Sequence, residues 1–214
     1  MTELWLVRHG QTDWNLTGRW QGQASDAPGL NETGRAQALA IREQMNGNNF
    51  SAVYSSDLLR ARQTAELIAQ PLGLTVALEP RLREINLGAW EGMLSEEIET
   101  KYPQALAERA RNPFETPAPD GESPSEVTER VLAAVHEIVG RHPDESILIV
   151  AHGVSLAVII CNTPGISDGG CLRAHPKQCA AISRAMASIG IYTLGINHAN
   201  HPFHTKVNSP IDCR

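Results

Sequence analysis

Several features that define whole classes of protein are missing from this sequence. No apolar run reaches the roughly 18 residues of a membrane-spanning helix, and the longest candidate, residues 147–160, is broken by His152. The first residues include Glu3, Arg8 and Asp13, where a secretory signal needs an apolar core. We therefore expect neither a membrane protein nor a secreted one, and we predict a cytoplasmic location.

Basic residues and paired cysteines are also scarce. The chain has 18 Lys and Arg against 24 Asp and Glu, which gives a net charge of -6. This acidic balance argues against nonspecific binding to nucleic acid. All four cysteines lie in the last third of the chain without CxxC spacing. In the absence of a secretory signal, we expect them to be reduced thiols.

The remaining composition is that of one globular domain, which we place at residues 1–214. Hydrophobic residues make up 42% of the chain and charged residues 20%, and this length supports one substantial core rather than two. Apolar runs typical of strands alternate with segments of helical periodicity. We therefore predict the α/β class, as a three-layer α/β/α sandwich with a mainly parallel central sheet. The strands are expected at 4–7, 52–54, 75–78, 147–151 and 187–194, with residues 205–207 pairing at the sheet edge, and the main helices at 31–45, 58–73 and 123–140.

The segments between these elements are less regular. Residues 13–29 are rich in Gly, Asn, Gln and Asp, so we predict a loop, and residues 55–57 are expected to form a turn that caps the next helix. Residues 95–111 have helical composition interrupted by Pro103. The proline-rich stretch after them fits either an interdomain linker or a lid. Its length favours a lid, which we place around residues 95–122.

Cationic and imidazole side chains follow two of the predicted strands directly. Arg8 and His9 come after the first strand and His152 after the fourth, each followed by glycine. Open α/β sheets bind ligands outside the carboxyl ends of their strands. We therefore expect these three side chains to share one rim of the sheet.

Arg60 falls in the first turn of its predicted helix, where the helix dipole disfavours a cation. A bound anion nearby would account for this position. The alternative is a solvated arginine on the surface.

Together these residues would suit a phosphoryl group. Arginine forks stabilise charge on phosphoryl oxygens, and an imidazole with a free nitrogen can attack phosphorus to give a covalent intermediate. The leaving alkoxide needs a proton, and Glu84 is the candidate donor. Alternatively, Glu84 only pairs with Arg81 or Arg83.

Five blocks of residues follow one another along the chain: Leu6-Val7-Arg8-His9-Gly10-Gln11-Thr12 with Asn15, Gln21-Gly22, residues 55–65 around Arg60, Leu82-Arg83-Glu84 through Gly92, and Ala151-His152-Gly153. In this order they resemble the histidine phosphatase superfamily, which includes the cofactor-dependent phosphoglycerate mutases and many small phosphatases. The resemblance covers Leu4 to about residue 160, and the segment 161–214 is atypical.

The resemblance implies a role for each matching residue. His9 would be the phosphorylated nucleophile and Glu84 the proton donor, while Arg8, Arg60 and His152 would bind the phosphoryl oxygens. No metal and no other cofactor is implied. The implied residues that line the substrate site are Asn15, Gln21, Gly22 and Gly153.

The leading functional prediction is a phosphomonoesterase that hydrolyses a small phosphorylated metabolite. A phosphoglycerate mutase is the alternative, but family mutases resemble one another in carrying paired arginines between the proton donor and the capping-box helix. In this chain carboxylates outnumber Lys101, Arg109 and Arg111 there. A noncatalytic phosphate-binding protein is a more remote alternative, and a homodimer is left open. The histidines at 198, 201 and 204 could indicate a metal site, but Pro202 favours a solvated tail.

Overall fold

The structure, a computed structural model, describes residues 2–162 and 191–196. Several sequence predictions lie outside these residues: the pairing of residues 205–207, the histidines at 198, 201 and 204, and Cys171, Cys179 and Cys213.

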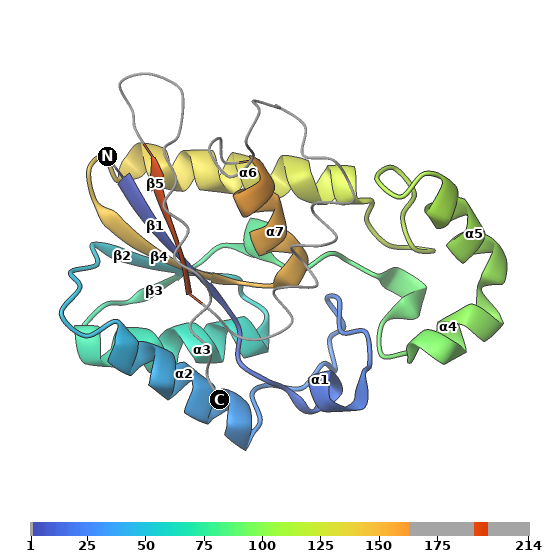
Figure 1. Cartoon of the computed structure of the whole chain (residues 1–214), viewed down its shortest axis with the longest axis horizontal. Coiled ribbons are helices and arrows are strands. Elements are labelled where there is room, and N and C mark those ends of the chain that lie inside the picture. Colours follow the sequence, from blue (N-terminus) through green and yellow to red (C-terminus); the bar gives the residue numbers. More distant parts are fainter. Residues whose placement is uncertain (1, 163–190, 197–214) are drawn as a thin grey trace.

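A five-stranded sheet lies at the centre of the molecule (Figure 1). Its strands have the order β3-β2-β4-β1-β5. All pairs are parallel except that of β5 with β1, which is antiparallel. The prediction of a mainly parallel sheet is therefore confirmed. The strands are β1 (Thr2–Arg8), β2 (Ala52–Ser55), β3 (Val76–Leu78), β4 (Ser146–Ala151) and β5 (Ile191–Ile196).

Helices cover both faces of the sheet, with α2 (Glu32–Gln44) and α3 (Leu59–Ala69) on one face and α6 (Pro124–Arg141) and α7 (Gly153–Asn162) on the other (Figure 1). Successive strand residues point to opposite faces, so the two central strands contribute to both cores. The predicted three-layer sandwich is therefore confirmed. Val7, Leu148 and Val150 pack with α2 and α3, whereas Leu4, Leu6, Ile147 and Ile149 pack with α6 and α7.

The start signals of two helices act as the sequence predicts. The Asn31 side chain accepts a hydrogen bond from the Gly34 amide at 2.9 Å and caps α2. Ser123 forms a capping box with Glu126, and Pro124 is the first residue of α6. Both signals satisfy amide groups that have no partner inside the helix.

The expected loop at residues 13–29 was wrong at its start, because it begins with the short helix α1 (Asp13–Thr17). Thr12 and Asn15 form a capping box in which the Thr12 amide donates to Asn15 Oδ1 at 3.0 Å. Gly18, with φ of 74°, ends the helix. One helical turn is too short to show periodicity, so this reciprocal cap was its only signal.

Two other boundaries also differ from expectation. The N-cap of α3 is Leu58, whose side chain cannot accept a hydrogen bond, while the Asp57 carboxylate accepts from Arg83 Nε at 2.6 Å. Asp57 therefore does not cap α3, because its carboxylate is bound to Arg83, a residue distant in sequence. Strand β5 ends at Ile196, two residues beyond its predicted end, because its length is set by pairing with β1.

The chain between β3 and α6 forms an extension beside the sheet (Figure 1). It contains α4 (Ser95–Lys101) and α5 (Pro103–Arg111), so the predicted interruption at Pro103 is confirmed. Short 3-10 turns complete the described elements: η1 (Gln70–Leu72), η2 (Pro80–Leu82) and η3 (Gly88–Trp90).

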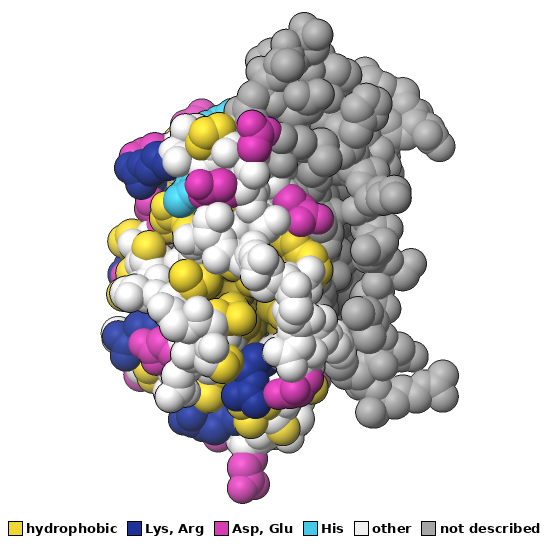
Figure 2. Space-filling view, turned by 90° about the vertical axis from the view of Figure 1, so that its left-hand side faces the viewer, with side chains coloured by type: hydrophobic (Ala, Val, Ile, Leu, Met, Phe, Trp, Pro, Cys, Tyr) yellow, Lys and Arg dark blue, Asp and Glu magenta, His cyan; other side chains and the backbone are white. Residues whose placement is uncertain are grey.

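The described surface in Figure 2 carries acidic and basic side chains side by side, around a group of hydrophobic side chains near the middle of the view. Within residues 2–162 and 191–196, no helix has both the length and the apolar character needed to cross a membrane.

Candidate active site

The carboxyl ends of β1 and β4 bring the two predicted histidines together. Arg8 pairs in register with Ala151, and the His9 amide donates to the Ala151 carbonyl at 3.1 Å. The ring centroids of His9 and His152 lie 5.1 Å apart. The shared rim predicted from the two strand ends is therefore present.

His9 is held as a neutral imidazole with a defined tautomer. Its Nδ1 lies 2.7 Å from the Gly10 carbonyl oxygen, which can only accept, so Nδ1 carries the proton. Arg60 Nε, which can only donate, lies 3.2 Å from His9 Nε2. Burial lowers the pKa of His9 well below its ordinary value, and the charges of Arg60 and Arg8 lower it further. Nε2 therefore carries a lone pair at neutral pH, which accepts the hydrogen bond from Arg60.

Arg60 is buried, with 2% of its surface exposed. This excludes the alternative of a solvated surface arginine. Besides contacting His9, it donates from Nη2 to the Gly22 carbonyl at 2.8 Å. Burial lowers its pKa to about 10, and the nearby carboxylate of Glu84 opposes that shift. Arg60 remains a cation at neutral pH.

His152 is completely buried. Its Nε2 lies 2.8 Å from the Ser56 hydroxyl, whereas its Nδ1 has no hydrogen-bond partner within the described part of the chain. Burial lowers the pKa of His152 well below its ordinary value, and the positive charges of Arg60, Arg8 and Arg130 lower it further. A buried polar atom without a partner is costly, and a bound phosphoryl oxygen could satisfy it if Nδ1 carries the proton.

Glu84 lies on the loop that joins β3 to α4, and its carboxylate reaches the start of α7. Glu84 Oε1 accepts from the Ile85 amide at 3.0 Å and from the Val154 amide at 3.1 Å. Neither predicted ion pair forms, since Arg81 pairs with Glu79 and Glu137, and Arg83 pairs with Asp57. The alternative in which Glu84 only neutralises a neighbouring arginine is therefore wrong.

The loop after α1 supplies a further part of the site. Gly22 has φ of 48°, and a Cβ there would lie 2.2 Å from Glu91 Oε1. Only glycine fits this conformation and this close approach. Its backbone carbonyl, not a side chain, provides the contact to Arg60.

Three further predicted residues have structural contacts of their own. Asn15 is exposed and its Oδ1 belongs to the capping box of α1. Gln21 is buried, with Oε1 3.0 Å from the Thr12 hydroxyl. Gly153 is the buried first residue of α7. Asn15 and Gln21 thus lie on α1 and the loop after it, and Gly153 lies at the start of α7. Their contacts with a substrate remain predictions.

Sequence reasoning missed residues that hold this arrangement. Thr64 is buried one turn after Arg60 and accepts a hydrogen bond from the Gly10 amide at 3.1 Å. Arg130 lies on α6 between the buried Val127 and Val131. A cation next to an apolar stripe was the signal that could have identified it.

The geometry combines two neutral imidazoles, the buried cation of Arg60 and a nearby carboxylate. Such a set can attack, bind and protonate a phosphate ester with side chains alone. Among the described residues, no group of three or more His, Cys, Asp or Glu is arranged to hold a metal ion.

Comparison with known proteins gives a consistent result. The model of the histidine phosphatase superfamily (branch 1) matches residues 4–187. "Phosphoserine phosphatase 1" of Hydrogenobacter thermophilus is 35% identical over 166 residues, covering 78% of each chain. "Probable phosphoglycerate mutase GpmB" of Erwinia tasmaniensis is 37% identical over 187 residues, covering 86% of this chain and 84% of that one.

A solved structure extends the likeness to the fold. Mycobacterial glucosyl-3-phosphoglycerate phosphatase, in complex with VO3, superposes with a TM-score of 0.75 at 29% identity, over 96% of this chain and 97% of the other. The family model alone covers far more than half of the sequence. The chain therefore belongs to the histidine phosphatase superfamily and is an enzyme of that superfamily.

Proposed function

We propose that this protein is a phosphomonoesterase that hydrolyses a small phosphorylated metabolite through a phosphohistidine at His9. The observation that carries the proposal is the state of His9. Nδ1 carries the ring proton and Nε2 accepts from Arg60, so Nε2 holds the lone pair that can attack phosphorus. Attack on phosphorus forms the N–P bond while the ester P–O bond breaks, and water later cleaves the N–P bond.

Three side chains are assigned to the phosphoryl oxygens. Arg60 is fixed beside Nε2, His152 has an unsatisfied Nδ1, and the charge of Arg8 acts on both histidines. When a phosphate ester arrives, its oxygens would replace the imidazole as the partner of Arg60 and release the lone pair for attack. Positive charge placed in advance is the main requirement of phosphoryl transfer.

Glu84 is assigned to proton transfer. In its protonated form it would donate to the leaving alkoxide, and the resulting carboxylate would then take a proton from the attacking water. Its position at the start of α7, rather than in an ion pair with Arg81 or Arg83, leaves it available for this exchange. We also propose that no metal is required, because side chains supply the positive charge.

The segment 95–122 is proposed to be a lid over this site within the single domain 1–214. Its last part is anchored: the Ala89 amide donates to the Pro119 carbonyl at 2.9 Å and the Glu122 amide to the Asn86 carbonyl at 2.8 Å. Any opening would therefore have to leave residues 119–122 in place.

Phosphoglycerate mutase is the second candidate, since one of the relatives carries that name. A mutase needs a clamp for the substrate carboxylate. The guanidinium of Arg109 is instead stacked on Trp90, with its Cζ 5.5 Å from the ring centroid. That contact leaves Arg109 Nη1 without a hydrogen-bond partner among the described residues, so the preference for hydrolysis rests on the excess of carboxylates over basic residues in the segment 95–122. The names of the relatives make phosphoserine and phosphoglycerate derivatives the first esters to test.

The decisive experiment measures hydrolysis and isomerisation together. Purified enzyme is supplied with a panel of phosphorylated amino acids, sugars and glycerates in the presence of EDTA, and phosphate release is followed. A separate reaction contains 3-phosphoglycerate with a trace of 2,3-bisphosphoglycerate. We expect metal-independent release of phosphate from at least one ester and negligible formation of 2-phosphoglycerate. Isomerisation faster than phosphate release, and lost in an Arg109→Ala, Arg111→Ala variant, would establish the mutase instead.

A further inference from the structure

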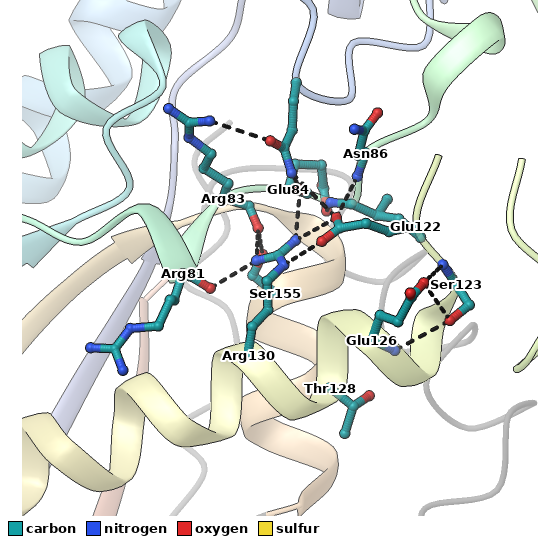
Figure 3. Close-up of polar contacts among 12 residues, drawn as sticks. Arg81, Arg83, Glu84, Asn86, Glu122, Ser123, Glu126, Thr128, Arg130 and Ser155 are labelled. Carbon is teal, nitrogen blue, oxygen red and sulfur yellow. Dashed lines mark hydrogen bonds and ion pairs between the residues drawn. The ribbon is translucent and has the colours of Figure 1, made fainter. Parts of the chain in front are cut away.

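An arginine outside the proposed phosphoryl pocket is bonded to the loop that carries Glu84 (Figure 3). Arg130 Nη1 donates to the carbonyls of Arg81 at 2.7 Å and Arg83 at 2.9 Å. Its Nη2 donates to the carbonyl of Glu84 at 3.0 Å. The guanidinium thus fixes three carbonyls within four consecutive residues of the loop.

The other two N–H groups of Arg130 bind Glu122. Nε donates to Glu122 Oε1 at 2.7 Å and Nη2 to Oε2 at 2.9 Å. All five donors of the guanidinium therefore have partners. The side chains are 19% and 23% exposed, so this is a shielded, bidentate pair. Only arginine has the planar five-donor geometry for this arrangement.

Glu122 extends the same hydrogen-bond network to Gln23, in the loop after α1. Its Oε2 accepts from the Asn86 amide at 2.8 Å and from Gln23 Nε2 at 3.2 Å. Gln23 Nε2 also donates to the Glu84 carbonyl at 2.9 Å. The Glu84 carbonyl is therefore held from α6 and from the loop after α1, and Glu122, at the end of the 95–122 segment, binds both Arg130 and Gln23.

We propose that Arg130 and Glu122 are positioning residues that place the Glu84 carboxyl for proton transfer. The inference rests on the proposed function, in which Glu84 serves the leaving group. Neither residue is assigned a contact with the phosphoryl group, so their removal should misplace the donor and leave the anion pocket intact. Because a displacement of about 1 Å can cost roughly a hundredfold in rate, the effect should appear in the chemistry rather than in binding.

The test compares esters whose leaving groups differ in their need for a proton. kcat/KM, which reports the steps through enzyme phosphorylation, is measured for 4-nitrophenyl phosphate and for the fastest alkyl ester among phosphoserine, 3-phosphoglycerate and glycerol phosphate. For Arg130→Lys we expect a loss of roughly a hundredfold with the alkyl ester and only a few-fold loss with the nitrophenyl ester. The inhibition constant of vanadate should stay unchanged.

Two reference variants separate the possible failures. Glu84→Gln should show the same leaving-group selectivity, and if it does not, the proposed role of Glu84 fails and this inference fails with it. If Glu84→Gln is selective but Arg130→Lys lowers both rates equally, or lowers neither, the positioning role alone is wrong. Arg141→Lys, at the exposed end of the same helix and paired with Glu137, should change neither rate.

A second variant of the Arg130–Glu122 ion pair tests the same role if Arg130→Lys does not fold. Glu122→Gln preserves the shape of the side chain but replaces one carboxylate oxygen with an amide group, which cannot accept from Arg130. It should reproduce the loss with the alkyl ester. Equal rates for Glu122→Gln and the unchanged enzyme with that ester would overturn the inference.

Discussion

At the scale of single residues, the two strand-end histidines lose the ability to take up a second ring proton when the chain folds. His9 and His152 are buried beside Arg60, and burial lowers the pKa of each well below the ordinary 6.5. In the unfolded chain both would titrate near 6.5. Folding is therefore linked to proton release at these two positions.

This linkage predicts how stability depends on pH. Between the lowered pKa of the folded state and pH 6.5, the unfolded state binds more protons, so the free energy of unfolding falls as the pH drops below 6.5. Each histidine contributes a slope of at most about 1.4 kcal/mol per pH unit. Urea unfolding from pH 7.5 to pH 5 should show the decrease, and His152→Gln should reduce its slope.

Another histidine provides the control for that measurement. His136 is exposed on α6, and its replacement by glutamine should leave the decrease below pH 6.5 as it is. If His136→Gln and His152→Gln reduced the slope equally, the burial of His152 would not be the cause.

At the scale of elements, the loop after α1 depends on the backbone of Gly22. A Cβ at this position would meet Glu91 Oε1, which accepts hydrogen bonds from the Gln23 amide at 2.6 Å and from the Leu87 amide at 3.1 Å. The Glu91 carboxylate cannot move away without breaking them. The backbone of Gly22 would shift instead, together with the carbonyl that orients Arg60.

We therefore expect Gly22→Ala to weaken inhibition by vanadate about tenfold or more, since each 1.4 kcal/mol is a factor of ten, and to lower stability by roughly 1–3 kcal/mol. Gly18→Ala is the matched control. Gly18 also has a positive φ, of 74°, but a Cβ there has no atom within 4 Å. It should share the backbone strain and keep the vanadate affinity. Equal affinity in both variants would contradict a special role for the Gly22 carbonyl.

The elements also show what the sequence could and could not predict. The strands β1 and β4 are each followed directly by a histidine, and this pattern located the site because parallel strands end at the same edge. The capping box of α6 located that helix. By contrast, α1 is too short to show helical periodicity. Asp57 does not cap α3 because it binds Arg83, whose position depends on the tertiary fold.

At the scale of the whole molecule, the parts of the site differ in how they depend on long-range packing. Arg8, His9 and His152 follow from two strands, so local pattern was sufficient. Glu84 had two competing interpretations, and only the fold shows that its neighbours pair elsewhere. Arg130 donates hydrogen bonds to backbone carbonyls 46 to 49 positions away in the sequence. The sequence around Arg130 gives no indication of those partners.

The measurement that tests the whole account most directly is capture of the covalent intermediate. Enzyme mixed with 32P-labelled ester and quenched within the first turnover should carry an acid-labile, base-stable phosphate. Peptide mapping should place it on His9, and His9→Ala should carry none. The intermediate should form at least as fast as phosphate is released. Label on another residue, label that persists in His9→Ala, or turnover faster than labelling would contradict catalysis through His9.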